Sequence, residues 1–422
     1  MRTRCIEPAR SPVNAELTAV PSKSWTHRAL VAAALADGRS RVDRPLDAAD
    51  TRCTRRGIVS LGLRVEDDEG SWVVHGGGGR IPGGARIDCE ASGTTARFLS
   101  ALAATGSRPS VLDGSPRLRE RPMEELVTAL GALGAFVSAP GGGLPLEAGG
   151  PGLHGGSVTI SGRRSSQFAS ALLLVGPALA DGLELTVAPP RASFAYVLLT
   201  TRVLEQFGVI VRRTGDGTFA VAPQRVVPAT LASEGDHSSA SYAFLAAAVT
   251  GGRVRVAGLD ADSFQPDARF SRDLATIGCV VRAEAAGITV EGGTPLSAFD
   301  WDLEDAPDLA PAAAVLALFC HGESRLRGVG NLRLKESDRL AALASGLARL
   351  GAAVRVEDDA LTVRPPAAGA AGASIDVAGD HRIAMAFAIA GLRVPGVVLS
   401  DATVVGKSYP GFWEDLERLS GR

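Results

Sequence analysis

Lysine is almost missing from this chain of 422 residues, since only three of its 44 basic residues are lysine and the rest are arginine. Arginine serves wherever only a positive charge is needed, whereas a position that keeps lysine needs a compact ammonium group with a tunable pKa. Tyrosine, with three residues, is as scarce as lysine, and asparagine, with two, is scarcer. These residues are candidates for chemical roles, with a handful of leftover surface residues as the alternative: Lys23, Lys335, Lys407, Tyr196, Tyr242, Tyr409, Asn14 and Asn331.

Long apolar runs are missing too. The longest stretch without a charge or turn residue is Ala312 to Cys320, far short of the roughly 20 residues that span a bilayer, and the N-terminus has no apolar targeting region. A net charge of −2 with scattered arginines gives no basic footprint for nucleic acid. The five cysteines show neither metal-ligand spacing nor a disulfide framework. We therefore expect a cytoplasmic enzyme or binding protein without a metal, nucleic-acid or membrane partner.

Internal repetition is the strongest pattern that is present. An apolar residue and a glycine followed by a short β-branched strand recur at Gly62, Gly134, Gly208, Gly278 and Gly351. An Ala/Leu-rich run that begins with polar residues recurs between them, and a truncated copy, FWEDLERL, closes the chain. Six α/β units of about 70 residues account for the whole length. Six such buried helices in one chain predict two lobes of three units each.

The starts of the apolar helices carry the first functional signal. Each begins with Ser, Thr or Asp, the residues preferred at a helix N-cap, and several starts also carry Lys, Arg or Gln. A helix N-terminus attracts anions through its free N–H groups and its dipole. If the three starts of each lobe converge, the two lobes face each other across an anion-binding cleft. The starts are expected near Ser24, Ser92, Ser165, Ser238, Asp308 and Asp380.

Nine motifs, read in order, resemble those of the 5-enolpyruvylshikimate-3-phosphate synthase family. They are PSKSWTHRAL, SGTTARFL, RERPM, SSQF, EGDHSSASY, APDLA, NLRLKESDRL, GDHRIAM and GKSYP. The resemblance covers the whole chain and implies a two-lobe fold with an inside-out α/β barrel in each lobe. One lobe would be residues 21–233, with the acceptor phosphate contacts. The other would combine residues 1–20 and 234–422, with the catalytic aspartate and most donor contacts.

The resemblance also implies a reaction. The family transfers the enolpyruvyl group of phosphoenolpyruvate, the donor, to the 5-hydroxyl of shikimate 3-phosphate, the acceptor, without metal or organic cofactor; a monomer is expected. Both substrates carry a phosphate and a carboxylate, which arginine forks bind bidentately. By the family pattern the donor contacts are Lys23, Gly93, Arg121, Gln167, Arg339, Arg382 and Lys407. The acceptor contacts are Lys23, Ser24, Arg28, Ser165, Ser166, Gln167, Ser193, Tyr196, Asp308, Asn331 and Lys335.

Proton transfer needs tuned acid and base groups. Asp308 resembles the family's base for the hydroxyl, and Lys23, Lys335 and Glu336 resemble its other proton-transfer groups. Two alternatives stay open. A paralogue could act on another shikimate-like or cyclitol phosphate, because Glu90-Ala91 and Phe194-Ala195 depart from the usual pattern beside ligand-holding residues. A non-catalytic sensor of shikimate phosphates is the other, although it would not need Asp308, Glu336 and the lysines together.

Overall fold

The computed structural model describes residues 2–421. The chain divides into two compact units: unit 1 comprises Met1–Val20 and Glu234–Arg422, and unit 2 comprises Pro21–Ser233. Each unit has its own hydrophobic core, because one cluster of buried residues is drawn from unit 1 and the other from unit 2. Burial of apolar side chains therefore stabilises each unit separately.

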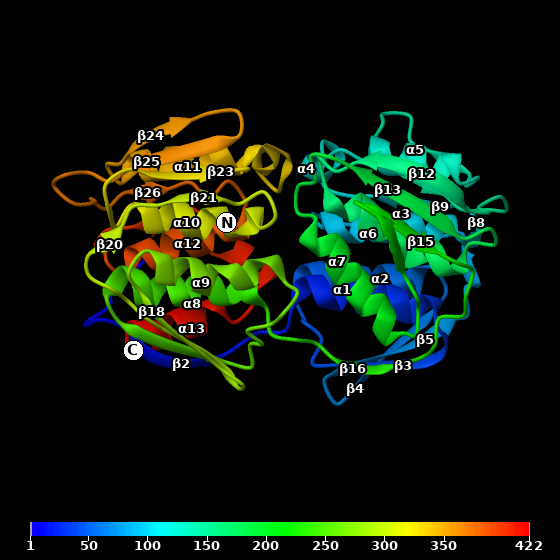
Figure 1. Ribbon diagram of the computed structural model, residues 1–422, viewed down its shortest axis with the longest axis horizontal. Helices are drawn as coiled ribbons and strands as arrows, with labels where there is room; N and C mark the ends of the chain where they lie inside the picture. The colour runs from blue at the N-terminus through cyan, green and yellow to red at the C-terminus, as the bar shows by residue number, and fades with distance from the viewer. Residues whose placement is uncertain (1, 422) are drawn as a thin grey trace. The chain divides into compact units, whose positions relative to one another are not determined.

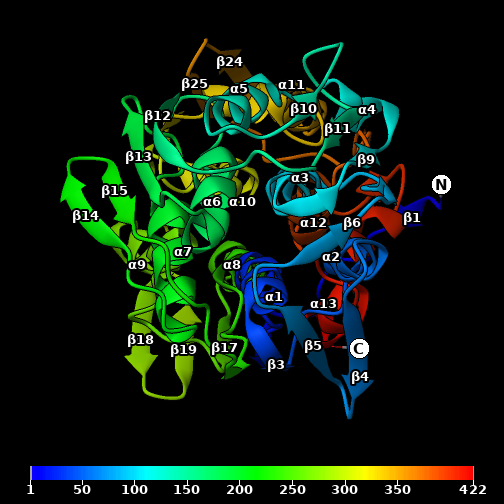
Figure 2. The same ribbon diagram turned by 90° about the vertical axis from the view of Figure 1, so that its right-hand side faces the viewer.

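Three apolar helices form the centre of each unit and contact one another there. Figure 2 shows those of unit 2 enclosed by sheets. These helices are buried around their whole circumference, as their Ala/Leu-rich sequences predict. In unit 2 they are α1 (Lys23–Leu35), α3 (Gly93–Ala104) and α6 (Ser166–Val175); in unit 1 they are α8 (His237–Thr250), α10 (Ala310–Ala317) and α12 (His381–Gly391).

Side-chain caps begin five of these six helices. Ser92, Ser165 and Asp380 are N-caps as expected, and the other two caps are Ser22 and Asp236, two residues before the expected starts. The exception is α10, which follows the 3-10 turn η3 (Pro307–Leu309) and has no side-chain cap. The expectation of a helix cap near Asp308 is therefore wrong, because that carboxylate binds two arginines instead.

The remaining helices cover the units with one buried face each. Their mixed sequences give the narrower apolar stripe of a surface helix. In unit 2 they are α2 (Ala49–Ser60), α4 (Pro116–Arg119), α5 (Glu124–Ala132) and α7 (Ala195–Gln206), with the 3-10 turn η1 (Gly176–Ala178). In unit 1 they are α9 (Arg269–Thr276), α11 (Arg339–Arg349) and α13 (Phe412–Ser420), with the 3-10 turns η2 (Pro266–Ala268), η4 (Gly330–Leu334) and η5 (Thr403–Lys407).

The repeats are most regular in their sheets. Each larger sheet starts with a pair of parallel strands. The strands that follow in the sheet are antiparallel to their neighbours. In unit 2 the sheet orders are β16 (Thr230–Ala232), β3 (Asp37–Asp43), β5 (Ser71–Gly77), β4 (Arg64–Asp68); β7 (Arg86–Asp88), β9 (Ser110–Asp113), β11 (Leu146–Ala148), β10 (Val137–Ser138); and β12 (Gly156–Ser161), β13 (Leu183–Ala188), β15 (Thr218–Val221), β14 (Arg212–Gly215).

Unit 1 repeats the pattern with a shortened last sheet. Its orders are β2 (Asn14–Thr18), β17 (Arg253–Ala257), β19 (Gly287–Glu291), β18 (Val280–Glu284); β21 (Asp300–Asp302), β23 (Ser324–Arg327), β25 (Ala360–Arg364), β24 (Ala353–Val356); and β26 (Ser374–Ile375), β27 (Val398–Leu399), β1 (Arg4–Cys5). Two short pairs complete the units, β6 (Ile81–Gly83) with β8 (Gly106–Arg108) and β20 (Leu296–Ser297) with β22 (Cys320–His321).

Two strands close sheets across long gaps in the sequence. Strand β2 pairs in parallel with β17, so the chain starts inside unit 1, and Figure 1 shows this dark-blue strand among the later-coloured elements of that unit. Strand β16 pairs in parallel with β3 and completes the first sheet of unit 2. The chain therefore enters unit 2 after Val20 and leaves it after Ser233.

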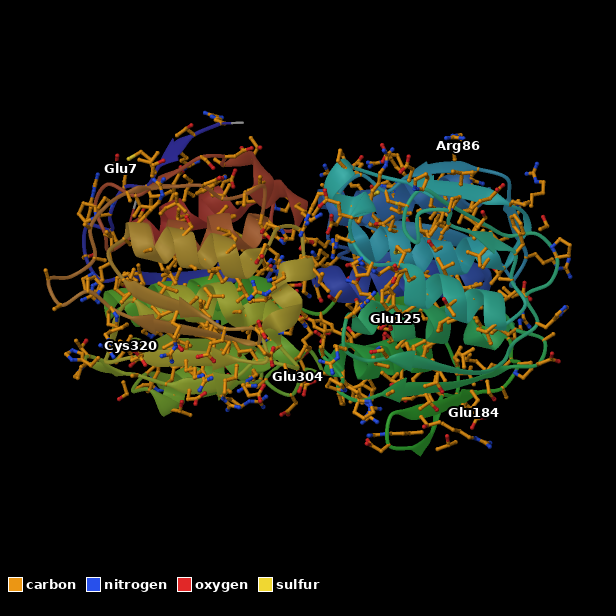
Figure 3. The ribbon with its side chains drawn as sticks, turned by 90° about the horizontal axis from the view of Figure 1, so that it is seen from above. Glu7, Arg86, Glu125, Glu184, Glu304 and Cys320 are labelled. Carbon is orange, nitrogen blue, oxygen red and sulfur yellow. The ribbon has the colours of Figure 1, made fainter. Side chains whose placement is uncertain are left out.

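The strands present polar side chains outward, because one face of each sheet packs on the buried helices. Figure 3 labels two such side chains, Arg86 of β7 and Glu184 of β13, both exposed. Within residues 2–421, no helix is both long enough and apolar enough to cross a membrane.

Close packing at Gly346 gives a test of the unit 1 core. A Cβ on this α11 residue would lie 2.3 Å from Cζ of Phe387, a fully buried ring on α12. We expect Gly346→Ala to destabilise the protein by about 1–3 kcal/mol, because the ring must move within a close-packed core. Thermal unfolding followed by circular dichroism measures the change.

A matched control is Gly131→Ala. Gly131 is exposed on α5, and its added Cβ would meet only Val137 Cγ1, at 3.8 Å. There we expect stabilisation of about 0.5–1 kcal/mol, because alanine favours the helix over glycine. Equal effects of the two substitutions would show that the contact with Phe387 does not limit the packing of α11.

Candidate active site

Asp308 lies at the centre of a charged cluster in unit 1. Its Oδ1 accepts from Arg339 Nη1 at 2.9 Å and its Oδ2 from Arg382 Nη2 at 2.8 Å. Lys335 Nζ lies 3.7 Å from Oδ1. The 3-10 turn before α10 and the first turn of α12 bring these side chains together. Three sequence motifs that are far apart, APDLA, NLRLKESDRL and GDHRIAM, thus meet at one carboxylate.

Arg339 is the most firmly held member of this cluster. Its side chain is 1% exposed, and its Nε donates to Asp380 Oδ2 at 2.7 Å while Nη2 donates to Glu336 Oε2 at 2.8 Å. Burial alone would lower the pKa of Arg339, but the carboxylates of Asp380, Glu336 and Asp308 outweigh it and raise that pKa. The guanidinium therefore keeps its charge and its orientation while one nitrogen, Nη1, faces Asp308.

Two further residues of unit 1 that the resemblance implies lie on 3-10 turns. Asn331 is on η4, which packs against α11, and among residues 2–421 its buried Oδ1 has no hydrogen-bond partner. A buried amide oxygen without a donor is costly unless a ligand supplies one. Lys407 ends η5, which packs against α12.

Asp267 is a buried acid beside this cluster. It lies on η2, is 1% exposed, and accepts a short hydrogen bond from Ser238 on α8. Burial and the nearby Asp308 carboxylate raise the pKa of Asp267 to about 6, although Arg382 opposes the shift. On α8, burial raises the pKa of Tyr242 to about 12, so this hydroxyl stays protonated beside Arg382.

The raised pKa of Asp267 predicts how its removal acts on stability. An acid whose pKa rises on folding binds protons more tightly in the folded state, so stability falls as pH rises from about 4 to above 6. We expect Asp267→Asn to stabilise the protein by about 1–2 kcal/mol at pH 8 and hardly at all at pH 4.5. Thermal unfolding at both pH values measures this.

Asp262→Asn is the matched control for that experiment. Asp262 is an exposed acid of the preceding loop, so its substitution should leave stability nearly unchanged at both pH values. A loss of stability at pH 8 in Asp267→Asn would mean that the ionised carboxylate supports the fold.

Arg28 is the corresponding buried cation of unit 2. It is 2% exposed and donates to Thr200 Oγ1 at 2.8 Å, to the carbonyl of Ser24 at 2.8 Å and to the carbonyl of Tyr196 at 3.0 Å. Among the described residues no acid forms an ion pair with it, and burial lowers the pKa of Arg28 to about 10. A buried cation held only by neutral groups favours an anionic ligand.

The serines expected to bind a phosphate lie on two neighbouring loops. Ser165 caps α6 and Ser166 begins it, so their N–H groups lie at the positive end of that helix. The loop before α7 lies beside them, because Ala192 N donates to the carbonyl of Gly162 at 3.0 Å. On that loop Ser193 has a φ of 60°, a left-handed conformation that non-glycine residues seldom adopt.

The start of α3 is a second helix N-terminus of unit 2 with cationic and polar side chains around it. A Cβ on Gly93 would lie 2.6 Å from Arg121 Nη1, so the guanidinium packs directly on this glycine. Arg97 donates to Gln167 Oε1 at 2.9 Å, and Gln167 Nε2 donates to Thr94 Oγ1 at 3.1 Å. These bonds join the starts of α3 and α6, as converging helix starts require.

Lys23 lies at the start of α1 with its Nζ 3.2 Å from Asp50 Oδ2. Both side chains are largely buried, at 15% and 6% exposure, so the ion pair is screened less than a surface pair. Sequence reasoning missed Asp50 and Asp267 as neighbours of the candidate site. It expected Asp380 at a helix start, within the motif GDHRIAM, but not as a partner of Arg339.

Comparisons with known proteins show which family the chain is similar to. The family model described as EPSP synthase (3-phosphoshikimate 1-carboxyvinyltransferase) matches residues 8–416. Relatives named 3-phosphoshikimate 1-carboxyvinyltransferase include one from Methanoculleus marisnigri, 44% identical over 410 residues and covering 96% of each chain, and one from Syntrophobacter fumaroxidans, 44% identical over 420 residues and covering 99% of each chain.

A solved EPSP synthase structure from Acinetobacter baumannii is similar with a TM-score of 0.83 and 26% identity, covering 99% of this chain and 98% of that one. The likeness confirms the expected α/β fold of repeated units. The chain therefore belongs to the EPSP synthase (3-phosphoshikimate 1-carboxyvinyltransferase) family.

Proposed function

We propose that this chain transfers the enolpyruvyl group of phosphoenolpyruvate to the 5-hydroxyl of shikimate 3-phosphate and releases phosphate. The observation that carries the proposal is the placement of Asp308 between Arg339 and Arg382, with Lys335 beside it. A reaction between two phosphorylated carboxylates needs arginine forks for the anions and a carboxylate for the hydroxyl proton. Membership of the family supports the same reaction.

Each unit contributes a different part of the proposed chemistry. In unit 2, Arg28 and Ser24 would orient the acceptor ring and its carboxylate, while the loops carrying Ser165, Ser166, Ser193 and Tyr196 would hold its phosphate. In unit 1, Asn331 would bind the acceptor ring through its buried amide. The donor contacts proposed are Lys23, Gly93, Arg121, Gln167, Arg339, Arg382 and Lys407.

The reaction is an addition followed by an elimination. The acceptor oxygen attacks C2 of the donor while C3 gains a proton, and Asp308 takes the hydroxyl proton. C3 then loses a proton as phosphate leaves C2, which restores the double bond. Lys23, Lys335 and Glu336 are the groups proposed to move the C3 proton, and their partial burial keeps bulk water from competing with them.

The deciding experiment follows phosphate release from phosphoenolpyruvate by the purified protein with shikimate 3-phosphate as acceptor. Turnover with this acceptor supports the proposal. Turnover only with another cyclitol phosphate would point to the paralogous activity, and tight binding of shikimate 3-phosphate without turnover would point to a sensor. We also propose that the protein is cytoplasmic, since both substrates are phosphorylated metabolites. We propose that it is a monomer, and light scattering after gel filtration measures its mass.

A further inference from the structure

Asp308, the proposed base, is hydrogen-bonded to Arg339 and Arg382, which are two of the proposed donor contacts. Asp308 uses one oxygen for Arg339 Nη1 at 2.9 Å and the other for Arg382 Nη2 at 2.8 Å. With each oxygen already accepting from a guanidinium group, this carboxylate has fewer lone pairs left for a hydroxyl. In this arrangement neither the base nor the two arginines are ready for the reaction.

The other contacts of Arg339 show which of its nitrogens a ligand can reach. Asp380 binds Nε and Glu336 binds Nη2, and both carboxylates are largely buried, at 0% and 13% exposure. The third nitrogen, Nη1, pairs with Asp308, whose side chain is 22% exposed. A solvent-borne anion therefore reaches Arg339 by replacing Asp308, and the buried acids stay in place behind the guanidinium.

The balance of charge leads to the same conclusion. Among the ion pairs that the structure describes within residues 2–421, those of the cluster join three carboxylates, Asp308, Glu336 and Asp380, to three cations, Lys335, Arg339 and Arg382. Asp267 adds a further acid beside them. A bound anion would give this partly buried cluster excess negative charge, which is costly. The cost falls if Asp308 turns away toward solvent or accepts a proton.

We infer that Asp308 is an internal substitute for the donor's anionic group on Arg339 and Arg382, and that donor binding displaces it and thereby frees it to act as the base. This inference rests on the proposed function for the roles of the three residues. It links two events that the reaction needs together, because the hydroxyl would lose its proton only when an electrophile is in place. The acceptor alone would leave the carboxylate paired and inactive.

Displacement has a signature in binding that catalysis does not share. When a protein must first leave a closed state, the apparent affinity for its ligand is reduced by the fraction that is open. Inorganic phosphate is a suitable probe, because it needs only the arginines and cannot react. We expect Asp308→Asn to bind phosphate about tenfold or more tightly than the wild type in isothermal titration calorimetry. Asp308→Ala serves as the second variant and should change affinity in the same direction.

Glu336→Gln is the matched control, since it removes a carboxylate charge that lies 2.8 Å from Nη2 of the same guanidinium, whereas Asp308 pairs with Nη1. Loss of charge alone predicts equal gains in the two variants, whereas displacement predicts a gain of less than about threefold for Glu336→Gln. Equal gains, weaker binding in Asp308→Asn, or no phosphate binding to any variant would overturn the inference. If the Asp308 variants bind phosphate more tightly but the wild type does not turn over both substrates, the proposed function fails. The inference that Asp308 occupies the anion site on Arg339 and Arg382 is then still supported.

Discussion

Asp308→Asn is expected to lower kcat by at least about 10²-fold, the range for loss of a positioned general base. The amide keeps the size of the side chain and one hydrogen-bond acceptor. It loses the negative charge that pairs with Arg339 and Arg382 and the ability to take a proton. Binding of shikimate 3-phosphate should therefore stay within about tenfold of the wild type, which separates proton transfer from binding.

Steady-state phosphate release and calorimetry of shikimate 3-phosphate measure the two quantities. Asp338→Asn is a useful control, because Asp338 caps the neighbouring helix α11 and accepts from Ala341 N at 3.0 Å. Asparagine caps a helix about as well as aspartate, so this substitution should leave both stability and kcat nearly unchanged. If affinity for shikimate 3-phosphate fell in parallel with kcat in Asp308→Asn, Asp308 would be a ligand contact and another group would be the base.

Replacing either scarce lysine of the site by arginine is expected to cost at least about 10²-fold in turnover. Lys23 and Lys335 are each held near one carboxylate, Asp50 at 3.2 Å and Asp308 at 3.7 Å. A guanidinium keeps the charge but spreads it over a wider fork and does not release a proton in the accessible pH range. Folding should be unaffected, since the ion pairs can re-form.

The comparison that tests this is between Lys23→Arg, Lys335→Arg and a surface exchange in the opposite direction. Arg202→Lys changes the same chemistry in an exposed pair with Glu205, and its kcat should match the wild type. Equal thermal stability of all three variants would exclude a folding defect. Near-native turnover in either lysine variant would show that its position needs charge alone.

The fold was predictable because it repeats. The glycines at 62, 134, 208, 278 and 351 marked the ends of surface helices, and all five adopt the positive φ that those ends require. The apolar helices were found from composition alone. Strands β1 and β2 could not be assigned from sequence, because the partners that give them a place in a sheet lie at the far end of the chain.

Site residues could be predicted from the sequence where a residue type has one common role in such a motif. Lys335, Arg339 and Arg382 sit in motifs with a fixed spacing, and the structure brings all three to Asp308. Aspartates were harder, because the same residue caps helices. Asp236 caps α8, whereas Asp380 caps α12 and also binds the buried Arg339 of another helix. Local sequence cannot separate these two cases, since the second contact comes from tertiary packing.

The interrupted unit 1 has a consequence for synthesis on the ribosome. Residues 21–233 contain every strand and helix of unit 2, and its last strand, β16, is made at Ala232. Because domains fold as they emerge, unit 2 can fold while much of the other unit is untranslated. The first 20 residues must wait, since β2 needs β17 and β1 needs β27.

A strand that waits without its partner is open to wrong pairing with other chains. The waiting segment, MRTRCIEPARSPVNAELTAV, carries Arg2, Arg4, Glu7 and Arg10 and is broken by Pro8 and Pro12. Charges and prolines of this kind protect an exposed strand from aggregation. The first 20 residues place Ile6, Val13, Leu17 and Ala19 in the core of unit 1, and their charges and prolines disfavour wrong pairing until the last sheet of that unit can close.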